Sequence, residues 1–436
     1  MKILLILPYT PYPLDSGGNQ AVFSMIEALR QEHSLTLVLR GEETDAIRAL
    51  RERLPEVEIK LYPWPGSQED NPYTNFGFNS SRFKFIQYIA ASFRRKYYRY
   101  LMRHENSDLL SPFSARLKSQ FHQSDKGFNP DSAFYRYIGE LAQNGYDAIQ
   151  CEFANTLPLV YYLPETITRI FIHHELAFVR LENEVALFTD KNADDRAKLK
   201  RLKDEELAML RHFDHIITLT QTDKELLEKE LPDKPIYASP AVIYAEKEKT
   251  FTPCGQELCF VGNSAHFPNL DGLLWFCENV VPELRKHLPD FCLKVTGKWD
   301  DKVKKHLQKL VPEIEFVGFI PELSAYLNGK ISIIPIRIGS GMRMKVLESI
   351  QAQSPIVITS KGIEGQDFDH ETDCLIADAP ADFSAAIARL VADRELQEKV
   401  CKNAKNKIKQ HYHPQEMIEK RLSIYREIEK TNFIEK

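Results

Sequence analysis

The stretch ISIIPIRIGSGMRMKVLESIQAQSPIVIT, residues 331–359, decides the fold of this 436-residue chain. It reads as a buried strand, a glycine turn, a helix and a second buried strand, which is typical of a parallel sheet covered by helices. The turn Gly339-Ser340-Gly341 is expected to open the helix. A helix N-terminus presents free N–H groups and a partial positive charge, so the stretch predicts an anion site.

Three charged residues make this prediction more specific. Arg343 and Lys345 fall in the first turn of the expected helix, where cations oppose the helix dipole and are unfavourable without a bound anion. A solvated helix face is the alternative for both, and their position argues against it. Glu348 would repel phosphate, but its carboxylate can accept hydrogen bonds from ribose hydroxyls. The combination favours a nucleotide diphosphate over free phosphate.

Length and composition limit the classes of protein to consider. A chain of this length suggests two domains of about 200 residues each, and its net charge of −5 gives no indication of nucleic-acid binding. Seven cysteines without a C-x-x-C pair favour a reducing compartment and argue against disulfides or structural zinc. The apolar run 2–7 is too short for a signal peptide or a membrane span, so a cytoplasmic protein is expected.

The chain alternates between strand-like and helix-like segments, which predicts two α/β units with parallel sheets. In the first unit the expected strands are 2–7, 35–39, 147–151, 169–173 and 215–220, and the expected helices are 18–31, 43–54 and 195–212. In the second unit the expected strands are 257–261, 291–296, 314–317, 331–336, 355–359 and 374–376. The predicted domains are 1–245 and 246–413, joined by a proline-rich hinge at 232–253, with a last helix at 414–430 packing back on the first domain.

The segment 66–130 breaks this alternation and is interpreted as an insertion. It contains a basic run at 82–103, with seven Lys or Arg residues and no acid. One interpretation is a solvated helix face. The other is a surface that meets an anionic membrane, giving peripheral contact with the inner face of the cytoplasmic membrane, or a lipid-linked acceptor.

Two further glycines follow the first expected strand. Gly17 and Gly18 lie at its carboxyl end, where ligands bind in open parallel sheets, although a plain tight turn is the alternative. The loop is neither a G-x-G-x-x-G nor a G-x-x-x-x-G-K-[ST] motif, which disfavours dehydrogenases and P-loop proteins. The D-x-D at Asp367-Phe368-Asp369 is interpreted as a chance match, so no metal is expected.

A histidine pair closes another expected strand. His173 and His174 are followed by Glu175, and one of the two imidazoles should point out of the carboxyl edge of the sheet. A zinc site is disfavoured because no H-E-x-x-H spacing is present; a structural role is the main alternative. Glu152, just after the strand 147–151, is a candidate acid on the acceptor side, with a plain surface carboxylate as the alternative.

These elements together resemble the retaining glycosyltransferases of the group 1 family, which have the GT-B fold: two Rossmann-like parallel-sheet domains facing a central cleft. The likeness is carried by FVGN at 260–263, PNLDG at 268–272, FVGFI at 316–320 and the residues 339–348, which look like a version of the family's E-x7-E element. The first glutamate of that element falls on Ser340. The Arg and Lys usual in the first C-terminal loop are replaced by NSAH at 263–266.

The resemblance implies roles for particular residues. Either His173 or His174 falls where the family places a histidine facing the donor sugar, and the sequence leaves both open as catalytic candidates. The residues implied to bind the donor are Gly17, Gly18, Gly262, Asn263, Phe319, Gly341, Arg343, Lys345 and Glu348.

The resemblance also implies a reaction. A sugar would move from a nucleotide-diphosphate sugar to a hydroxyl of a saccharide or lipid-linked acceptor, with retention and without metal or cofactor, in bacterial surface-polysaccharide assembly. Three alternatives stay open: a nucleotide-sugar epimerase, a non-catalytic GT-B binding protein and a membrane-associated scaffold.

Overall fold

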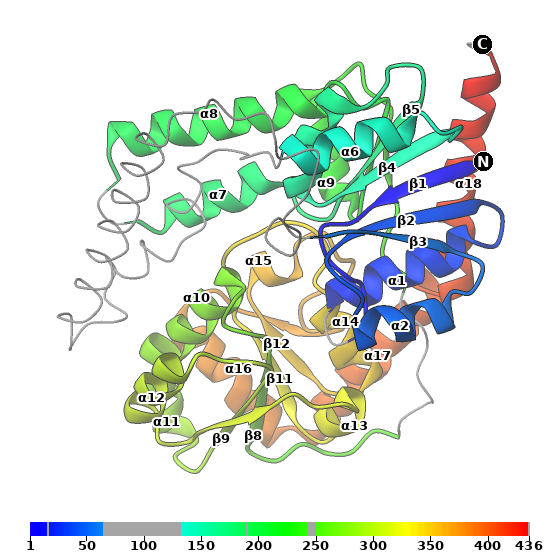
Figure 1. Cartoon of the computed structure of the whole chain (residues 1–436). Helices are drawn as coiled ribbons and strands as arrows, with labels where there is room; N and C mark the ends of the chain where they lie inside the picture. The colour runs from blue at the N-terminus through cyan, green and yellow to red at the C-terminus, as the bar shows by residue number, and fades with distance from the viewer. Residues whose placement is uncertain (15–16, 64–131, 189–190, 243–249, 435–436) are drawn as a thin grey trace.

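The computed structural model describes residues 1–14, 17–63, 132–188, 191–242 and 250–434. The expected insertion 66–130 and its basic run at 82–103 lie outside these residues, and so does the proposed membrane-facing surface. The described chain forms two parallel sheets flanked by helices, one above the other in Figure 1. We call the part built on the first sheet the N-terminal lobe and the part built on the second the C-terminal lobe.

The N-terminal lobe contains a seven-stranded parallel sheet in the order β3-β2-β1-β4-β5-β6-β7. Its strands are β1 (Lys2–Ile6), β2 (Ser34–Arg40), β3 (Glu58–Tyr62), β4 (Ala148–Glu152), β5 (Thr168–His173), β6 (His215–Thr218) and β7 (Ile236–Ala238). Its helices are α1 (Gly17–Leu29), α2 (Asp45–Arg53), α6 (Ser132–Ala142), η3 (Ala154–Tyr162), α7 (Ala177–Ala186), α8 (Ala193–Leu210) and α9 (Gln221–Glu230). Two hydrophobic clusters, one on each face, bury the sheet.

The C-terminal lobe repeats the plan with six parallel strands in the order β10-β9-β8-β11-β12-β13. Its strands are β8 (Glu257–Val261), β9 (Cys292–Thr296), β10 (Ile314–Gly318), β11 (Ile331–Ile334), β12 (Ile356–Ile358) and β13 (Leu375–Ile376). Its helices are α10 (Phe267–Trp275), η4 (Phe276–Val280), α11 (Val281–His287), α12 (Asp301–Leu310), α13 (Leu323–Leu327), α14 (Met344–Gln351), α15 (Ser360–Ile363), α16 (Pro380–Ala392) and α17 (Arg394–His411).

The last helix, α18 (Pro414–Ile434), returns to the N-terminal lobe. It contacts α1, and Leu422, Tyr425 and Ile428 belong to the same buried cluster as the side chains of β1 and α1. Figure 1 shows α18 in red beside the blue N-terminal strands and helices. The last helix therefore contributes to the hydrophobic core of the N-terminal lobe.

The strand predictions agree closely with the structure, with two omissions. Each expected strand is present with its ends shifted by at most two residues. β3 was not expected, and β7 lies inside the segment 232–253 that the sequence indicated as a hinge. β7 has only three residues, so it is too short to show a recognisable pattern.

The strand orders place the candidate site. Each sheet reverses its order next to its first strand, between β1 and β4 in one lobe and between β8 and β11 in the other. Ligands of open parallel sheets bind outside the carboxyl ends of the strands at such reversals. The segments that follow these four strands are therefore expected to line a ligand site.

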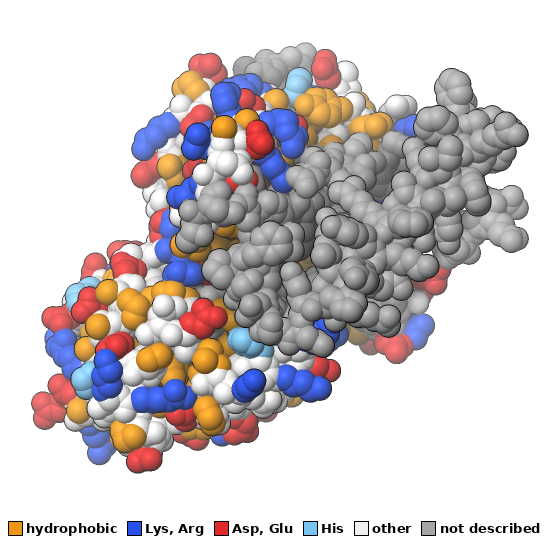
Figure 2. Space-filling view, turned by 90° about the vertical axis from the view of Figure 1, so that its left-hand side faces the viewer, with side chains coloured by type: hydrophobic (Ala, Val, Ile, Leu, Met, Phe, Trp, Pro, Cys, Tyr) orange, Lys and Arg blue, Asp and Glu red, His pale blue; other side chains and the backbone are white. Residues whose placement is uncertain are grey.

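The described surface carries charges of both signs. Figure 2 shows acidic and basic side chains interspersed over both lobes, with neither sign dominating the part of that face that is coloured by type. Within the described ranges, no helix has the length and apolar character needed to cross a membrane.

Candidate active site

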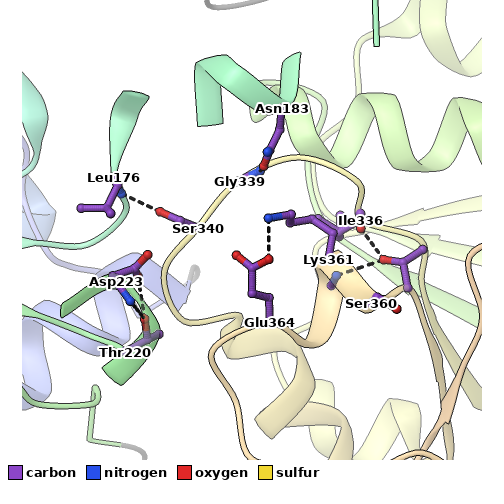
Figure 3. Close-up of polar contacts among 12 residues, drawn as sticks. Leu176, Asn183, Thr220, Asp223, Ile336, Gly339, Ser340, Ser360, Lys361 and Glu364 are labelled. Carbon is purple, nitrogen blue, oxygen red and sulfur yellow. Dashed lines mark hydrogen bonds and ion pairs between the residues drawn. The ribbon is translucent and has the colours of Figure 1, made fainter. Parts of the chain in front are cut away.

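The loop between β11 and α14, in the C-terminal lobe, contacts the N-terminal lobe through hydrogen bonds. Its residues Gly339, Ser340 and Gly341 are all hydrogen-bonded to the N-terminal lobe. Figure 3 shows Gly339 beside Asn183 and Ser340 beside Leu176. The bonds run from Gly339 N–H to Asn183 Oδ1 (3.1 Å), from Leu176 N–H to Ser340 Oγ (2.6 Å) and from Gly341 N–H to Asp223 Oδ2 (2.9 Å). The position where the family's first glutamate would stand is thus used as a contact between lobes.

The two glycines of this loop are required by its geometry. Gly341 has φ +76°, and a Cβ there would lie 2.1 Å from the backbone oxygen of His174. Gly339 has φ +117°. Both values lie in the region that glycine adopts without steric cost. In this conformation the two N–H groups expected to meet an anion donate to Asn183 and Asp223 instead.

Closure of the lobes should therefore depend on Gly341. Gly341→Ala is expected to lower the thermal stability of the closed form and to increase the radius of gyration in solution scattering, because the new methyl group cannot fit against His174. Gly145→Ala is the matched control: Gly145 has φ +72°, but a Cβ there meets nothing within 4 Å. If both variants keep the wild-type radius, the contact does not hold the lobes together.

Arg343 is the N-cap residue of α14, which begins at Met344, three residues later than the glycine turn led us to expect. Its guanidinium turns back and donates to the carbonyl oxygens of Ser340 and Gly341, and to that of Lys361 at 3.3 Å. Burial lowers the pKa of Arg343, and the carboxylates of Glu175, Asp223 and Glu364 oppose this shift. Arg343 therefore braces the loop.

Lys345, at the start of α14, is the second cation here, and it makes fewer hydrogen bonds than Arg343. Its Nζ donates to Asn269 Oδ1 (2.6 Å) and lies 5.0 Å from the centroid of the Phe260 ring. Burial lowers the pKa of Lys345 to about 7; nearby Glu348 opposes the shift and Arg343 adds to it. Among the described residues Lys345 makes no ion pair, so its ammonium group can accept an anion.

Glu348 and the start of α1 at Gly17 and Gly18 come together across the lobes. Glu348 is half-buried, and its Oε1 accepts a hydrogen bond from Gln20 Nε2 (3.2 Å) on α1. Gly17 lies against the start of α14, since a Cβ there would be 2.5 Å from Cβ of Met344. The beginnings of α1 and α14, which follow β1 and β11, are thus in direct contact. Side chains here would have to move apart to admit a diphosphate.

The loop after β8 supports Lys345 from the other side. Asn263 Oδ1 accepts from the N–H of His266, and the Asn263 carbonyl accepts from Asn269 Nδ2 (3.3 Å). Gly262 packs on Asn269, which in turn binds Lys345. Phe319 follows β10 at the same edge of the sheet, two strands away, and its side chain is 61% exposed. It offers a free aromatic face there.

His173 points away from this site. It ends β5 on the face that packs against α8, where its Nε2 lies 2.8 Å from Oε1 of Glu206. Glu206 also accepts the N–H groups of Ala177 and Phe178 at the start of α7. The His173 side chain is fully buried, so the structure assigns it to a core contact and not to the cleft.

His174 lies on the opposite face, because side chains alternate along a strand. Its Nε2 is 2.8 Å from Oε2 of Glu152, and its ring stacks on Phe153 with centroids 3.9 Å apart. Its backbone oxygen is the atom that approaches Gly341. The interpretation of Glu152 as a plain surface carboxylate was wrong, since this side chain is fully buried. Glu152 is linked to the site by its contact with His174.

The carboxylates of the D-x-D motif at 367–369 lie beside the ammonium group of Lys407. Asp369 and Asp373 both accept from Lys407 Nζ, and Asp367 lies 3.7 Å from it. No group of three metal-ligating side chains occurs in the part of the chain that the structure describes.

Sequence reasoning missed several residues of the site, among them Gln20 and Asn183. Gln20 could have been suspected, because it lies one helical turn from Gly17. Asn183 could not be predicted from a local sequence pattern, because it is separated by 156 positions from Gly339, to which it is hydrogen-bonded.

Residues 255–393 match the family model described as group 1 glycosyl transferases. A Klebsiella pneumoniae protein, described as an uncharacterized 44.6 kDa protein in the cps region, is 21% identical over 432 residues, which is 94% of this chain and 96% of that protein.

Solved structures are similar over nearly the whole chain. A mutant of TarM from S. aureus, in complex with fondaparinux, α-GlcNAc-glycerol and UDP, has a TM-score of 0.64 at 12% identity and covers 98% of this chain and 100% of its own. Sucrose-phosphate synthase from Thermosynechococcus elongatus has a TM-score of 0.63 at 15% identity and covers 99% of both chains.

These findings define the class. The chain has the GT-B fold. Its residues 255–393, which carry Lys345, Glu348 and the loop between the lobes, match the model of the group 1 glycosyl transferases.

Proposed function

We propose that this protein transfers a sugar from a nucleoside-diphosphate sugar to a hydroxyl of a saccharide or lipid-linked saccharide, with retention at the anomeric carbon and without a metal ion. The observation that carries the proposal is the placement of Lys345 and Glu348 on the first turns of α14, where the strand order reverses. There the ammonium of Lys345 makes no ion pair with any described residue.

The donor would bind as follows. Its diphosphate lies against Lys345 and the N-terminus of α14, whose partial positive charge adds to that of the ammonium. Its ribose hydroxyls donate to Glu348 in place of Gln20, and its base lies along the exposed face of Phe319. The TarM structure contains UDP, and a structure of Anabaena HepE, with a TM-score of 0.58, contains UDP and glucose; both support a nucleotide in a fold of this kind.

The same groups would assist the reaction. As the sugar leaves, negative charge grows on the diphosphate, and a fixed cation in a site closed to water stabilises that charge strongly. The contacts of Gly339 and Gly341 with the N-terminal lobe have to open for the donor to enter and re-form to exclude water. His174 lies beside this loop on the N-terminal side, where the transferred sugar would sit.

The location of the K. pneumoniae relative in a cps region supports a role in surface-polysaccharide assembly. Such a protein would act at the cytoplasmic face of the membrane, where nucleotide sugars and lipid-linked acceptors meet. The test is to incubate the protein with nucleotide sugars and lipid-linked saccharides and to determine the anomeric configuration of the product by NMR. Inversion would exclude retention, and conversion of the donor sugar without acceptor would indicate an epimerase.

Nucleotide affinity should depend on pH through Lys345. With a pKa of about 7, Lys345 loses its proton in the free protein as the pH rises above 7, whereas a bound diphosphate favours the charged form. Affinity should therefore fall between pH 7.5 and 9, and titration calorimetry in buffers of different ionisation enthalpy should show proton uptake. Lys345→Arg should abolish both effects, because arginine stays charged throughout this range. Equal pH dependence in wild type and variant would remove Lys345 from the diphosphate site.

A further inference from the structure

A buried polar pair lies beneath His174 on β4. Gln150 and Glu152 are two residues apart in the strand, so they share one face of the sheet, and both are fully buried. This face is covered by α1 and by α18, the last helix of the chain. Buried polar groups cost free energy unless they are hydrogen-bonded, which makes their partners informative.

Hydrogen bonds connect α18 to His174 in a single chain of side chains. The Tyr425 hydroxyl on α18 donates to Gln150 Oε1. Gln150 Nε2 donates to Glu152 Oε1 (2.7 Å), and Glu152 Oε2 lies 2.8 Å from His174 Nε2. The series thus runs from a helix at the end of the sequence to the edge of the candidate active site.

The direction of each bond is fixed by chemistry. Burial raises the pKa of Tyr425, so its hydroxyl keeps its proton and acts as a donor. Gln150 must then present its oxygen to Tyr425 and its amide nitrogen to the carboxylate of Glu152. A carboxylate is an acceptor, so His174 must present Nε2–H to it. This leaves Nδ1 as the remaining polar atom of the His174 ring.

A second residue of α18 supplies positive charge to the same place. Arg421 is buried and donates to the side chain and the carbonyl of Ser239 (2.7 and 2.8 Å). Burial lowers the pKa of Arg421, and the polar contact with Tyr425 and the carboxylate of Glu152 oppose this shift. Arg421 and His174 also line the same small cavity. A buried carboxylate is costly without a compensating charge, and Arg421 provides one for Glu152.

We propose that Tyr425 and Gln150 are positioning residues: through Glu152 they fix the ring orientation and the tautomer of His174 at the cleft. The stacking of Phe153 on the His174 ring fixes its plane, and the hydrogen-bonded series fixes which ring edge faces Glu152. The consequence for catalysis rests on the proposed glycosyl transfer, whereas the effect on His174 does not. Tyr425 would otherwise be only a packed ring of the core, beside His33.

The first experiment reads the imidazole directly. We would label the histidines of the full chain with ¹⁵N, record their ring nitrogen signals, and assign those of His174 by their loss in His174→Asn. Tyr425→Phe keeps the ring and removes only the hydroxyl. It should shift the His174 signals toward a mixture of tautomers, while Tyr412→Phe, which removes the hydroxyl of another buried tyrosine, should leave them unchanged. Unchanged His174 signals in Tyr425→Phe would overturn the proposal.

The second experiment separates positioning from general stability. Tyr425→Phe should lower kcat about tenfold and leave the dissociation constant for the nucleotide unchanged, because the nucleotide-binding groups lie mainly on the other lobe. Gln150→Met interrupts the hydrogen-bonded series at the next position. It should also lower kcat and leave the dissociation constant for the nucleotide unchanged. It serves as the deciding variant if Tyr425→Phe does not fold. Equal losses in nucleotide affinity and kcat would indicate a merely structural role. If the wild type shows no transfer at all, the proposed function fails, but the NMR result still decides the role of Tyr425.

Discussion

Lys345→Met should reduce nucleoside-diphosphate affinity about 100-fold and abolish measurable sugar transfer. A hydrogen bond to a charged group contributes about 1.5–3 kcal/mol, and 3 kcal/mol corresponds to a factor of roughly 100 in affinity. The effect should be this large because the diphosphate would meet the Lys345 ammonium in a partly buried site, and α14 would then offer only its partial dipole charge. The measurement is titration calorimetry with the preferred nucleotide, followed by an activity assay.

The C-terminal lobe offers a matched control for this substitution. Lys330 lies over the ring of Tyr326 at 4.5 Å, much as Lys345 lies over Phe260, but it precedes β11 and so stands at the opposite edge of the sheet. Lys330→Met should leave binding and transfer unchanged. Similar losses in both variants would mean that the substitutions act through stability, and wild-type affinity in Lys345→Met would contradict the assigned diphosphate site.

Glu348→Ala should reduce affinity for the ribonucleotide by a factor of about 10–100, because the ribose hydroxyls lose a charged acceptor. If Glu348 binds the ribose hydroxyls, the protein should distinguish a ribonucleotide from a nucleotide that lacks these hydroxyls. The wild type should bind the ribonucleoside diphosphate more tightly than its 2′,3′-dideoxy form, and the variant should bind both equally. Calorimetric titration of the two proteins with the two nucleotides gives the four constants needed.

Gln20→Ala is the control for Glu348, since it removes one hydrogen-bond donor to the carboxylate and keeps the carboxylate itself. It should bind the ribonucleotide at least as tightly as the wild type. If Glu348→Ala keeps the preference for ribose, another residue accepts the hydroxyls and the assignment fails.

Much of the fold could be predicted because the signals are local. The apolar strands of 331–359 are bounded by glycine and proline, and their alternation with helical segments requires a parallel sheet. The same pattern predicts where the candidate site lies, since ligand loops follow strands at the reversal points. The short strand β7 was missed because three residues show no period.

The details of the site depend on contacts that the sequence does not contain. His173 and His174 could not be distinguished because the residues before them, 170–172, are apolar and buried on both faces of the sheet, so no alternation shows which face meets the cleft. The helix after Gly341 begins late because the glycine turn is bound to the other lobe by Asn183 and Asp223. Ser340, a departure from the family's element, has its partner in the N–H of Leu176, 164 positions away.

The most direct test of a nucleotide-sugar site at α14 is calorimetric titration of the wild-type protein with UDP, GDP, ADP and TDP, each with and without magnesium. We predict that one of the four binds selectively, with the same affinity in the absence of metal. Binding of none of them would contradict the account of Lys345 and Glu348 and would favour a GT-B protein that binds a carbohydrate or a partner without catalysis.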